Sequence, residues 1–272
     1  MQLTVSNESV SNTMNLFDSH CHLDDRTFLK DLEGTLQNAR DAGVCEMLTV
    51  GVDLESSRRA VELAESNSGV YASIGVHPHD AKSCDDSVIT ALSRLAGKKV
   101  VRAWGEIGLD FNRMYSPREN QEKWLVRQIQ AADNLGLPLI FHERDSQGRF
   151  LEILKSQFNP KTKGVVHCFS GNRADLSAYL DLGLYIGITG IVTIKTRGAD
   201  LREIVPGIPL NRLLIETDAP YLTPTPQKNK TRRNEPAFVK SVLLKLADVR
   251  QEDPEILAEA TTANARRLFN IP

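Results

Sequence analysis

The sequence alternates short apolar runs, rich in β-branched and aromatic residues, with longer segments of helical periodicity. This alternation is typical of repeated βαβ units, whose strands form a parallel sheet. It predicts eight strands, at Asn15–Asp18, Glu46–Val52, Val70–Val76, Val100–Ile107, Leu139–His142, Gly164–Cys168, Leu184–Ile188 and Leu213–Thr217. Eight such units favour an α/β fold in which the strands close into a (β/α)8 TIM barrel.

An open doubly wound sheet is the alternative architecture for the same alternation. Sheets of that kind usually carry a glycine-rich phosphate turn after the first strand. Here the first strand leads instead into the segment His-Cys-His-Leu-Asp-Asp, which begins at His20. The start of the chain therefore favours the barrel.

The segments between the strands have the period of helices. They predict helices at Asp31–Ala42, Leu54–Ser66, Asp86–Ala96, Arg118–Leu135, Gly148–Gln157, Asn172–Leu182, Pro236–Arg250 and Pro254–Phe269. Gly43, Gly136 and Gly183 each follow a helix and precede a strand, which is the use of glycine expected at a helix C-terminus. Proline at the first helical position suits the starts of the last two helices.

Length and composition bound the class of protein. The 272 residues, 41% of them hydrophobic, suffice for one large core, so we expect a single domain over residues 14–272. Residues 1–13 are polar, lack the apolar core of a signal peptide, and are expected to form a tail. No apolar run is long enough to span a membrane. The four cysteines show no disulfide or zinc spacing, which favours reduced thiols and a cytoplasmic location.

All six histidines stand where an apolar run gives way to polar residues. They are His20, His22, His77, His79, His142 and His167. Barrel enzymes build their sites at the carboxyl ends of the strands, and imidazole is the commonest protein ligand for metal ions. The placement of the histidines therefore predicts a metal site at one rim of the barrel.

The segment around His20 and His22 carries this prediction furthest. Because side chains alternate along a strand, both imidazoles point the same way and can chelate one ion, with Cys21 directed opposite. Glu106 ends the fourth strand, where a buried carboxylate is costly unless it is paired or bound to metal. Its two oxygens can bridge two ions. The alternatives are half-buried structural histidines and an ordinary ion pair of the glutamate.

The eighth strand offers two carboxylates of the same parity, Glu216 and Asp218, so either can point inward. We expect Asp218, which is nearer the rim, to bind metal and to orient or deprotonate an attacking water. His142 and His167 end the fifth and sixth strands, and each alone would more often be structural. Imidazole-rich sites suit Zn²⁺ or Mn²⁺, whereas Mg²⁺ prefers oxygen ligands.

Six stretches of the chain, in order and over roughly Leu16 to Phe269, resemble the TatD family of metal-dependent deoxyribonucleases. They are Phe-Asp-Ser-His-Cys-His-Leu-Asp, Ile-Gly-Val-His-Pro-His-Asp, Gly-Glu-Ile-Gly-Leu-Asp-Phe-Asn-Arg, Phe-His-Glu-Arg-Asp, Val-His-Cys-Phe-Ser-Gly and Ile-Glu-Thr-Asp-Ala-Pro-Tyr-Leu. The resemblance implies an amidohydrolase-like barrel. It also implies 3′→5′ exonuclease activity on single-stranded DNA, and often RNA. The implied cofactor is one or two divalent metal ions per site, and Mg²⁺ is expected to support activity.

The resemblance also implies a ligand set. By position, the family's metal ligands match His20, His22, Glu106, His142, His167 and Asp218. Glu106 matches the bridging carboxylate. Glu106 and Asp218 are the residues expected to act in catalysis. The role expected of the protein is in DNA repair or degradation.

Other residues near the strand ends are candidates for substrate contacts. Arg144 shares strand parity with His142 and is expected to reach a phosphate, unless it forms a surface ion pair. His77 is expected to contact a phosphate, unless it is a loop histidine fixed by Pro78. Arg113 and Tyr115 follow the fourth strand, where a cation and an aromatic ring can grip the backbone and stack a base.

Charge gives a weaker indication of the substrate. The chain has 33 Lys and Arg against 35 Asp and Glu, a net charge of −2, so no global positive field attracts nucleic acid. Arg232 and Arg233 belong to a basic run, with Lys228 and Lys230, in the last loop. On the catalytic rim this run would supply a local positive field; elsewhere it would be ordinary solvated surface.

Three functions fit these observations. The preferred one is a nuclease acting on single-stranded DNA or RNA, with no membrane association and no obligate protein partner. The second is a metal-dependent ester or amide hydrolase, such as an aminoacyl-tRNA deacylase, because the same ligands polarise a carbonyl as readily as a phosphoryl group. The third is a non-catalytic binder on a degenerate barrel, which the complete ligand set disfavours.

Overall fold

The computed structural model describes residues 14–272, so the predicted tail at residues 1–13 lies outside the described residues. The described chain contains one sheet of eight parallel strands whose order follows the sequence. The strands are β1 (Leu16–Cys21), β2 (Val44–Val50), β3 (Val70–Ile74), β4 (Val101–Asp110), β5 (Leu139–Arg144), β6 (Gly164–Val166), β7 (Tyr185–Ile188) and β8 (Leu213–Ile215). The predicted TIM barrel is confirmed, and the open doubly wound sheet is excluded.

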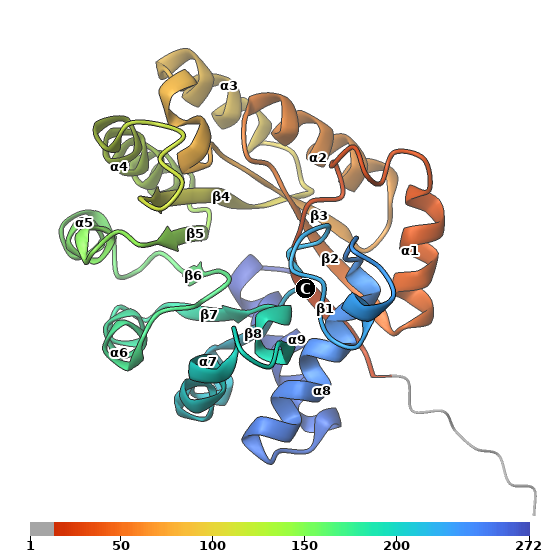
Figure 1. Ribbon diagram of the computed structural model, residues 1–272. Helices are drawn as coiled ribbons and strands as arrows, with labels where there is room; N and C mark the ends of the chain where they lie inside the picture. The colour runs from red at the N-terminus through yellow and green to blue at the C-terminus, as the bar shows by residue number, and fades with distance from the viewer. Residues whose placement is uncertain (1–13) are drawn as a thin grey trace, which may run out of the picture.

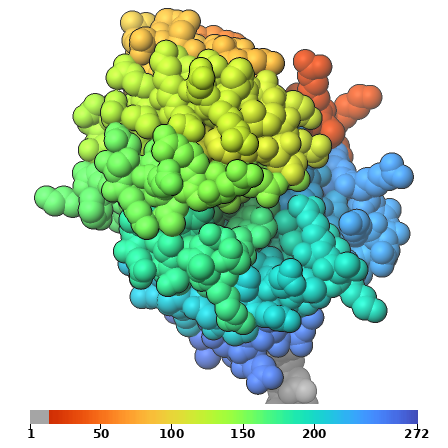
Figure 2. Space-filling model, turned by 60° about the vertical axis from the view of Figure 1, so that its left-hand side comes forward, coloured from red at the N-terminus to blue at the C-terminus, as the bar shows by residue number. Residues whose placement is uncertain are grey.

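The helices form a ring outside the strands (Figure 1). They are α1 (Leu32–Asp41), α2 (Leu54–Ser66), α3 (Asp86–Leu95), α4 (Arg118–Leu135), α5 (Arg149–Gln157), α6 (Arg173–Asp181), α7 (Ala199–Ile204), α8 (Val239–Arg250) and α9 (Pro254–Phe269). Figure 2 turns the side of the molecule that carries α4, α5 and α6 toward the viewer. No helix within residues 14–272 is long and apolar enough to cross a membrane.

Several predicted boundaries were wrong. Strand β1 continues to Cys21 and β4 to Asp110, so both run further toward the rim than their apolar runs do. Residues Pro236–Phe238 form a separate 3₁₀ turn before α8 instead of its first turn. Helix α7, between β7 and β8, was not predicted. The three glycines expected at helix ends all adopt positive φ, between 66° and 91°.

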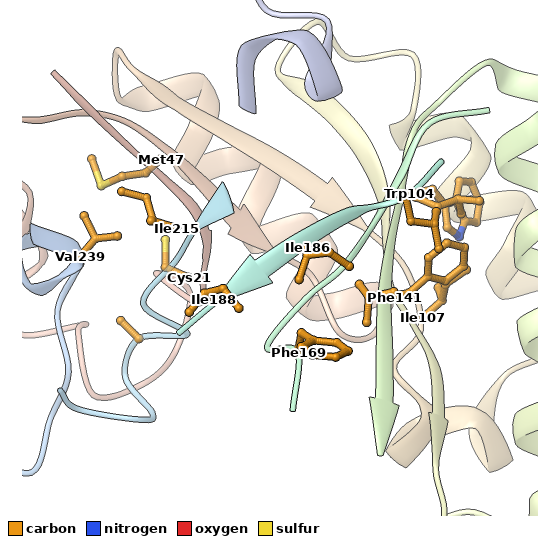
Figure 3. Packing of buried hydrophobic residues seen from close by; sticks show 14 of the residues in the cluster. Cys21, Met47, Trp104, Ile107, Phe141, Phe169, Ile186, Ile188, Ile215 and Val239 are labelled. Carbon is orange, nitrogen blue, oxygen red and sulfur yellow. The ribbon is translucent and has the colours of Figure 1, made fainter. Parts of the chain in front are cut away.

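Two apolar layers hold the barrel together. Inside it, one buried cluster takes side chains from most of the strands and is closed at the amino end by the last turn of α9, through Leu268 and Phe269. Outside it, a larger cluster fills the space between strands and helices. Figure 3 shows part of this outer layer, where Trp104, Ile107 and Phe141 of β4 and β5 lie together. A site is thereby confined to the carboxyl end.

Irregular pairing in β1 and β4 decides which side chains face inward. Phe17 packs in the inner cluster and His20 points into the carboxyl-end site, although simple alternation would place residues three apart on opposite faces. The pairing of β1 with β2 shifts register between Asp18 and Cys21, which accounts for the change. Ala103 and Glu106 repeat the pattern, and the pairing of β4 with β5 shifts between Trp104 and Ile107.

Side chains close the barrel where β1 meets β8. The carboxylate of Asp18 accepts hydrogen bonds from the backbone N–H and the hydroxyl of Thr217, at 2.9 and 2.6 Å. The Ser19 hydroxyl donates to the carbonyl of Ile215 at 3.0 Å. At the rim, backbone bonds join Asp218 N to His20 O and His22 N to Ala219 O. This seam holds the two segments that carry His20, His22 and Asp218 at a fixed separation.

Candidate metal centre

The site follows directly above the inner apolar layer. Ile140 and Val165 belong to that layer, and the residues two places later are His142, on β5, and His167, directly after β6. On the eighth strand, Leu214 is succeeded at the same spacing by Glu216 and Asp218. Strand alternation thus carries these side chains to the carboxyl end, and the two register shifts carry His20 and Glu106 there as well.

One oxygen of Glu106 faces a first group of ligands. Its Oε2 lies 3.4 Å from His20 Nε2 and 3.9 Å from His22 Nε2. The two imidazole nitrogens are 3.3 Å apart, and Asp218 Oδ1 lies 3.7 Å from the first and 3.3 Å from the second. Ligands about 2.0–2.1 Å from a tetrahedral zinc ion are separated by about 3.3 Å. The four groups therefore fit around one ion.

The other oxygen of Glu106 faces a second group. Its Oε1 lies 2.7 Å from His142 Nδ1 and 2.8 Å from His167 Nε2. The buried His167 Nε2 has no hydrogen bond of acceptable geometry within residues 14–272. A buried nitrogen left in this way costs about 1–3 kcal/mol, which an ion at the same place would offset. The donor set fits a second divalent ion, with Glu106 between the two.

Groups behind three of the histidines orient their rings. His22 Nδ1 lies 3.1 Å from the carbonyl of Val50, and this contact places the ring proton on Nδ1. Asp110 Oδ2 lies 3.5 Å from His142 Nε2, and Glu216 Oε1 lies 3.4 Å from His167 Nδ1. Carbonyls and carboxylates behind metal-binding histidines commonly fix the tautomer. Here the carbonyl contact of His22 is a hydrogen bond, whereas the two carboxylate contacts lack hydrogen-bond geometry within residues 14–272. With an ion bound, each ring would present an unprotonated nitrogen on the side of Glu106 or Asp218.

His77 differs from the other site histidines. Its Nδ1 accepts a hydrogen bond from the backbone N–H of His79 at 3.1 Å, so the proton of the neutral ring sits on Nε2. That Nε2 faces Glu106 Oε1 at 3.4 Å. Burial lowers the pKa of His77 to about 4, which keeps the ring neutral. His77 thus presents an N–H donor and no free lone pair, although it lies near Glu106 and His142.

The carboxylates of the site are ionised. Burial alone would raise the pKa of Glu106, but the surrounding histidines, led by His167 and His77, hold it well below its usual range. The pKa of Asp218 is lowered too, because its hydrogen bond with His22 and the nearby imidazoles together outweigh burial. The same contact raises the pKa of His22 to about 9 against the opposing effect of burial.

Glu216 occupies space that a glycine leaves open. A Cβ at Gly187 of β7 would lie 2.4 Å from Glu216 Oε2 and 2.7 Å from its Cδ. The same carboxylate accepts the backbone N–H of Cys168 at 2.5 Å and the hydroxyl of Ser19 at 3.3 Å. Both carboxylates of the eighth strand therefore point inward, with Asp218 nearer the rim and Glu216 behind His167.

The predicted substrate contacts lie in different surroundings. Arg113 and Arg232 are exposed and Arg144 is half-buried, and no hydrogen bond or ion pair of their guanidinium groups occurs within residues 14–272. Tyr115 is 56% exposed and its ring packs edge-on against His79, at 4.7 Å between centroids.

Arg233 has a structural setting that the sequence did not indicate. Its guanidinium binds both carboxylate oxygens of Asp31 at 2.8 and 2.7 Å, and one of Glu235 at 2.9 Å. It also lies over the ring of Phe28. The expected substrate role of Arg233 thus competes with an ion-pair network that joins the last loop to the start of α1.

Sequence reasoning assigned no role to Asp110. It is 1% exposed, accepts His79 Nε2 at 2.7 Å, and accepts the backbone N–H groups of Asn112 and Arg113 at 2.9 and 2.8 Å. The alternation of side chains along β4 would have predicted its position, because residues 106, 108 and 110 share one face of the strand. Tyr221 was also overlooked; its ring packs against His22 at 5.8 Å.

Comparison with known proteins identifies the family. The model for TatD-related DNases matches residues 17–270. The chain belongs to the TatD-related DNase family. It is 43% identical, over 258 residues, to a Klebsiella pneumoniae protein named 3′-5′ ssDNA/RNA exonuclease TatD, with 94% of this chain and 98% of the relative covered. The Escherichia coli K12 protein of the same name is 42% identical over 259 residues, with 94% and 99% covered.

Solved structures agree with the TatD assignment. The crystal structure of a TatD homologue from Escherichia coli, YJJV, superposes with a TM-score of 0.88 at 32% identity and covers 96% of this chain and all of that one. A phosphotriesterase homology protein from the same organism has a TM-score of 0.61 at 16% identity, with 91% and 99% covered, and shows the barrel fold alone. The predicted family and the predicted nuclease class are confirmed.

Proposed function

We propose that this protein is a divalent-metal-dependent 3′→5′ exonuclease that hydrolyses phosphodiesters of single-stranded DNA and RNA. The observation that carries the proposal is the position of the Glu106 carboxylate. Each of its two oxygens faces a separate group of imidazoles. The TatD relatives named above are exonucleases on the same substrate class. The free cysteines among residues 14–272 suit the reducing cytoplasm, where we place a role in DNA repair or degradation.

His20, His22 and Asp218 would hold one ion and His142 and His167 the other, with Glu106 between them. Bound divalent ions lower the pKa of water and neutralise phosphate oxygens. Imidazole donors favour Zn²⁺ or Mn²⁺, and the carboxylates Glu106 and Asp218 would also admit Mg²⁺. We propose that Mg²⁺ supports activity.

The chain's own residues divide the remaining work. Asp218 keeps 14% of its side chain exposed and is ionised, so it can accept the proton of an attacking water. His77 presents its Nε2–H to a non-bridging oxygen of the phosphate. Arg144, Arg113 and Arg232 carry guanidinium groups for flanking phosphates, since these side chains lack partners within residues 14–272. A 3′-terminal phosphodiester held there is cleaved to a 5′-mononucleotide.

The test is hydrolysis of a 5′-labelled single-stranded oligonucleotide with Mg²⁺, Mn²⁺ or Zn²⁺. We expect an EDTA-sensitive ladder that shortens from the 3′ end and is lost in His142→Ala and Asp218→Asn. Asp248→Asn is the matched control, because Asp248 is exposed and pairs only with Lys245 among the described residues. No ladder with any of the three ions would refute the proposal.

The same assay separates the competing functions. An RNA that carries a 3′-aminoacyl ester and loses the amino acid while its chain stays intact would indicate a deacylase. Binding of the oligonucleotide that is unchanged in His142→Ala and Asp218→Asn, without hydrolysis by wild type, would indicate a non-catalytic binder.

A further inference from the structure

A continuous row of aromatic rings crosses the mouth of the barrel. It runs from Tyr115 through His79, His77, His142, His167, His20 and His22 to Tyr221, with separations between successive centroids of 4.7, 4.3, 4.5, 5.6, 3.9, 5.1 and 5.8 Å. Glu106 touches the middle of the row through His142 and His167. The proposed reaction centre therefore lies between two tyrosines.

The ends of the row differ from its middle in exposure. Tyr115 and Tyr221 are 56% and 54% exposed, whereas His20, His77 and His167 are buried. Both tyrosines meet their histidine neighbour at a steep angle, 72° for Tyr115 and 68° for Tyr221. More than half of each tyrosine remains accessible to a flat ligand, and exposing aromatic rings to water is costly without one.

Tyr221 is fixed relative to the reaction centre. Its backbone N–H donates to the carbonyl of Asp218 at 2.8 Å, and its own carbonyl accepts from Asn234 Nδ2 at 2.6 Å. Its hydroxyl approaches Asp25 Oδ2 at 3.5 Å. The ring thus stands at a set distance from the carboxylate proposed to activate water.

Tyr115 is held less directly, through its neighbour. The hydroxyl of Ser116 donates to the carbonyl of His79 at 2.7 Å and accepts the backbone N–H of Lys82 at 3.0 Å. These bonds keep the loop after β4 against the turn that carries His77 and His79. The exposed cation Arg113 lies two residues before the tyrosine.

We propose that Tyr221 and Tyr115 are stacking platforms for the nucleobases on the two sides of the scissile phosphate, and that they select unpaired strands. The proposal rests on the proposed function. Every base offers a π-face, so stacking on tyrosine tolerates any sequence. In a duplex both faces of a base are covered by its stacked neighbours, so only a single strand can lay bases on both rings.

A cycle that combines a protein variant with an abasic nucleotide tests this directly. The oligonucleotides carry one abasic site at successive positions from the 3′ end, and kcat/KM is measured for wild type and Tyr221→Leu. On the intact strand we expect Tyr221→Leu to lower kcat/KM by about 5- to 150-fold, the range that loss of one base–aromatic stack produces. At one abasic position the variant should cause no further loss, because the base that stacked is already missing.

Matched variants separate stacking from other roles of the side chain. Tyr221→Phe keeps the ring, loses the Asp25 contact, and should retain wild-type kcat/KM. For Tyr115→Leu, the abasic position at which the variant causes no further loss of kcat/KM should lie on the other side of the cleaved bond. Tyr71→Leu should leave kcat/KM unchanged on every oligonucleotide, since Tyr71 lies at the amino end of β3, away from the site, and stacks on Phe17. Equal thermal midpoints would exclude unfolding as a cause.

A second readout does not depend on turnover. Quenching of 2-aminopurine in a single-stranded oligonucleotide, measured with metal-free protein, reports stacking even if hydrolysis fails. We expect wild type and Tyr221→Phe to quench and Tyr221→Leu not to. Equal kcat/KM of wild type and Tyr221→Leu, fully additive losses at every abasic position, or equal quenching by both proteins would overturn the proposal. Absence of hydrolysis by wild type would refute only the proposed nuclease.

Discussion

Gln128 of α4 makes the most specific stability prediction, because one buried amide serves three groups. Its Oε1 accepts the backbone N–H of Val76 at 2.7 Å and the indole N–H of Trp104 at 3.2 Å. Its Nε2 donates to the carbonyl of Val76 at 3.0 Å. The side chain acts as an extra strand residue beside the end of β3, directly before His77.

Replacing Gln128 by Met keeps length and volume but removes every one of these bonds. Val76 N–H, Val76 C=O and the Trp104 indole would then be buried without a partner, since all three lie where water does not reach. Each such group costs about 1–3 kcal/mol, so the total is about 3–9 kcal/mol. A domain of this size loses about 2 °C per kcal/mol, which gives a fall in Tm of about 6–18 °C.

Calorimetry and urea denaturation measure the effect, and Gln130→Met provides the control. Gln130 lies on the same helix but is exposed, so the identical change there should alter Tm by less than about 2 °C. We also expect Gln128→Met to reduce nuclease activity more than Gln130→Met does, because His77 follows Val76 directly. A Tm for Gln128→Met equal to that of Gln130→Met would show that the amide does not hold the strand end.

Three further predictions concern the site and the thiols. Gly187→Ala should displace the Glu216 carboxylate that stands behind His167. Calorimetric titration should then show divalent-ion affinity reduced about 10- to 100-fold. Gly207→Ala is the control and should leave the affinity unchanged, because a Cβ there meets no atom. Removing divalent ions with a chelator should lower Tm, and re-adding Mn²⁺ or Zn²⁺ should restore it in wild type but not in His142→Ala; equal midpoints with and without ions would contradict the site. At pH 8 a thiol reagent should titrate one cysteine of the folded protein, exposed Cys45, and four in denaturant. Burial raises the pKa of Cys84 and Cys168 to about 12 and holds that of Cys21 well above its usual range. Rapid reaction of all four in the folded state would refute this.

The alternation of strands and helices was sufficient to predict the barrel, because each apolar run needs a partner on both faces. The ends of β1 and β4 were harder to predict. His20 and Asp110 lie within strands, yet their segments are polar, and hydrophobicity alone ends a strand where the side chains stop being apolar. At a barrel rim the polar residues continue the strand, since the site replaces the core there.

The candidate ligands could be named from their positions at strand ends, whereas the groups that orient them could not. Asp110 contacts His142 on the neighbouring strand, and Glu216 contacts His167 across the width of β7; such pairs depend on register. The setting of Arg233 is another case, since its partner Asp31 is distant in sequence. The sequence of a basic run does not indicate whether its side chains are free or form ion pairs.

The two register shifts explain how one barrel accommodates both a packed interior and a cluster of charges. In β5 and directly after β6, alternation alone leads from an inner apolar residue to an inner ligand two places on. After β8 the ligand Asp218 lies four places beyond the inner residue Leu214. In β1 and β4 the inner apolar residue and the inner ligand are three apart, and each shift supplies the extra residue. Without the shifts, His20 and Glu106 would face the outer apolar layer, where an unpaired carboxylate costs far more than a cavity. Because Glu106 is the group that both clusters of imidazoles share, the irregular pairing of β4 does more to create the site than any single ligand.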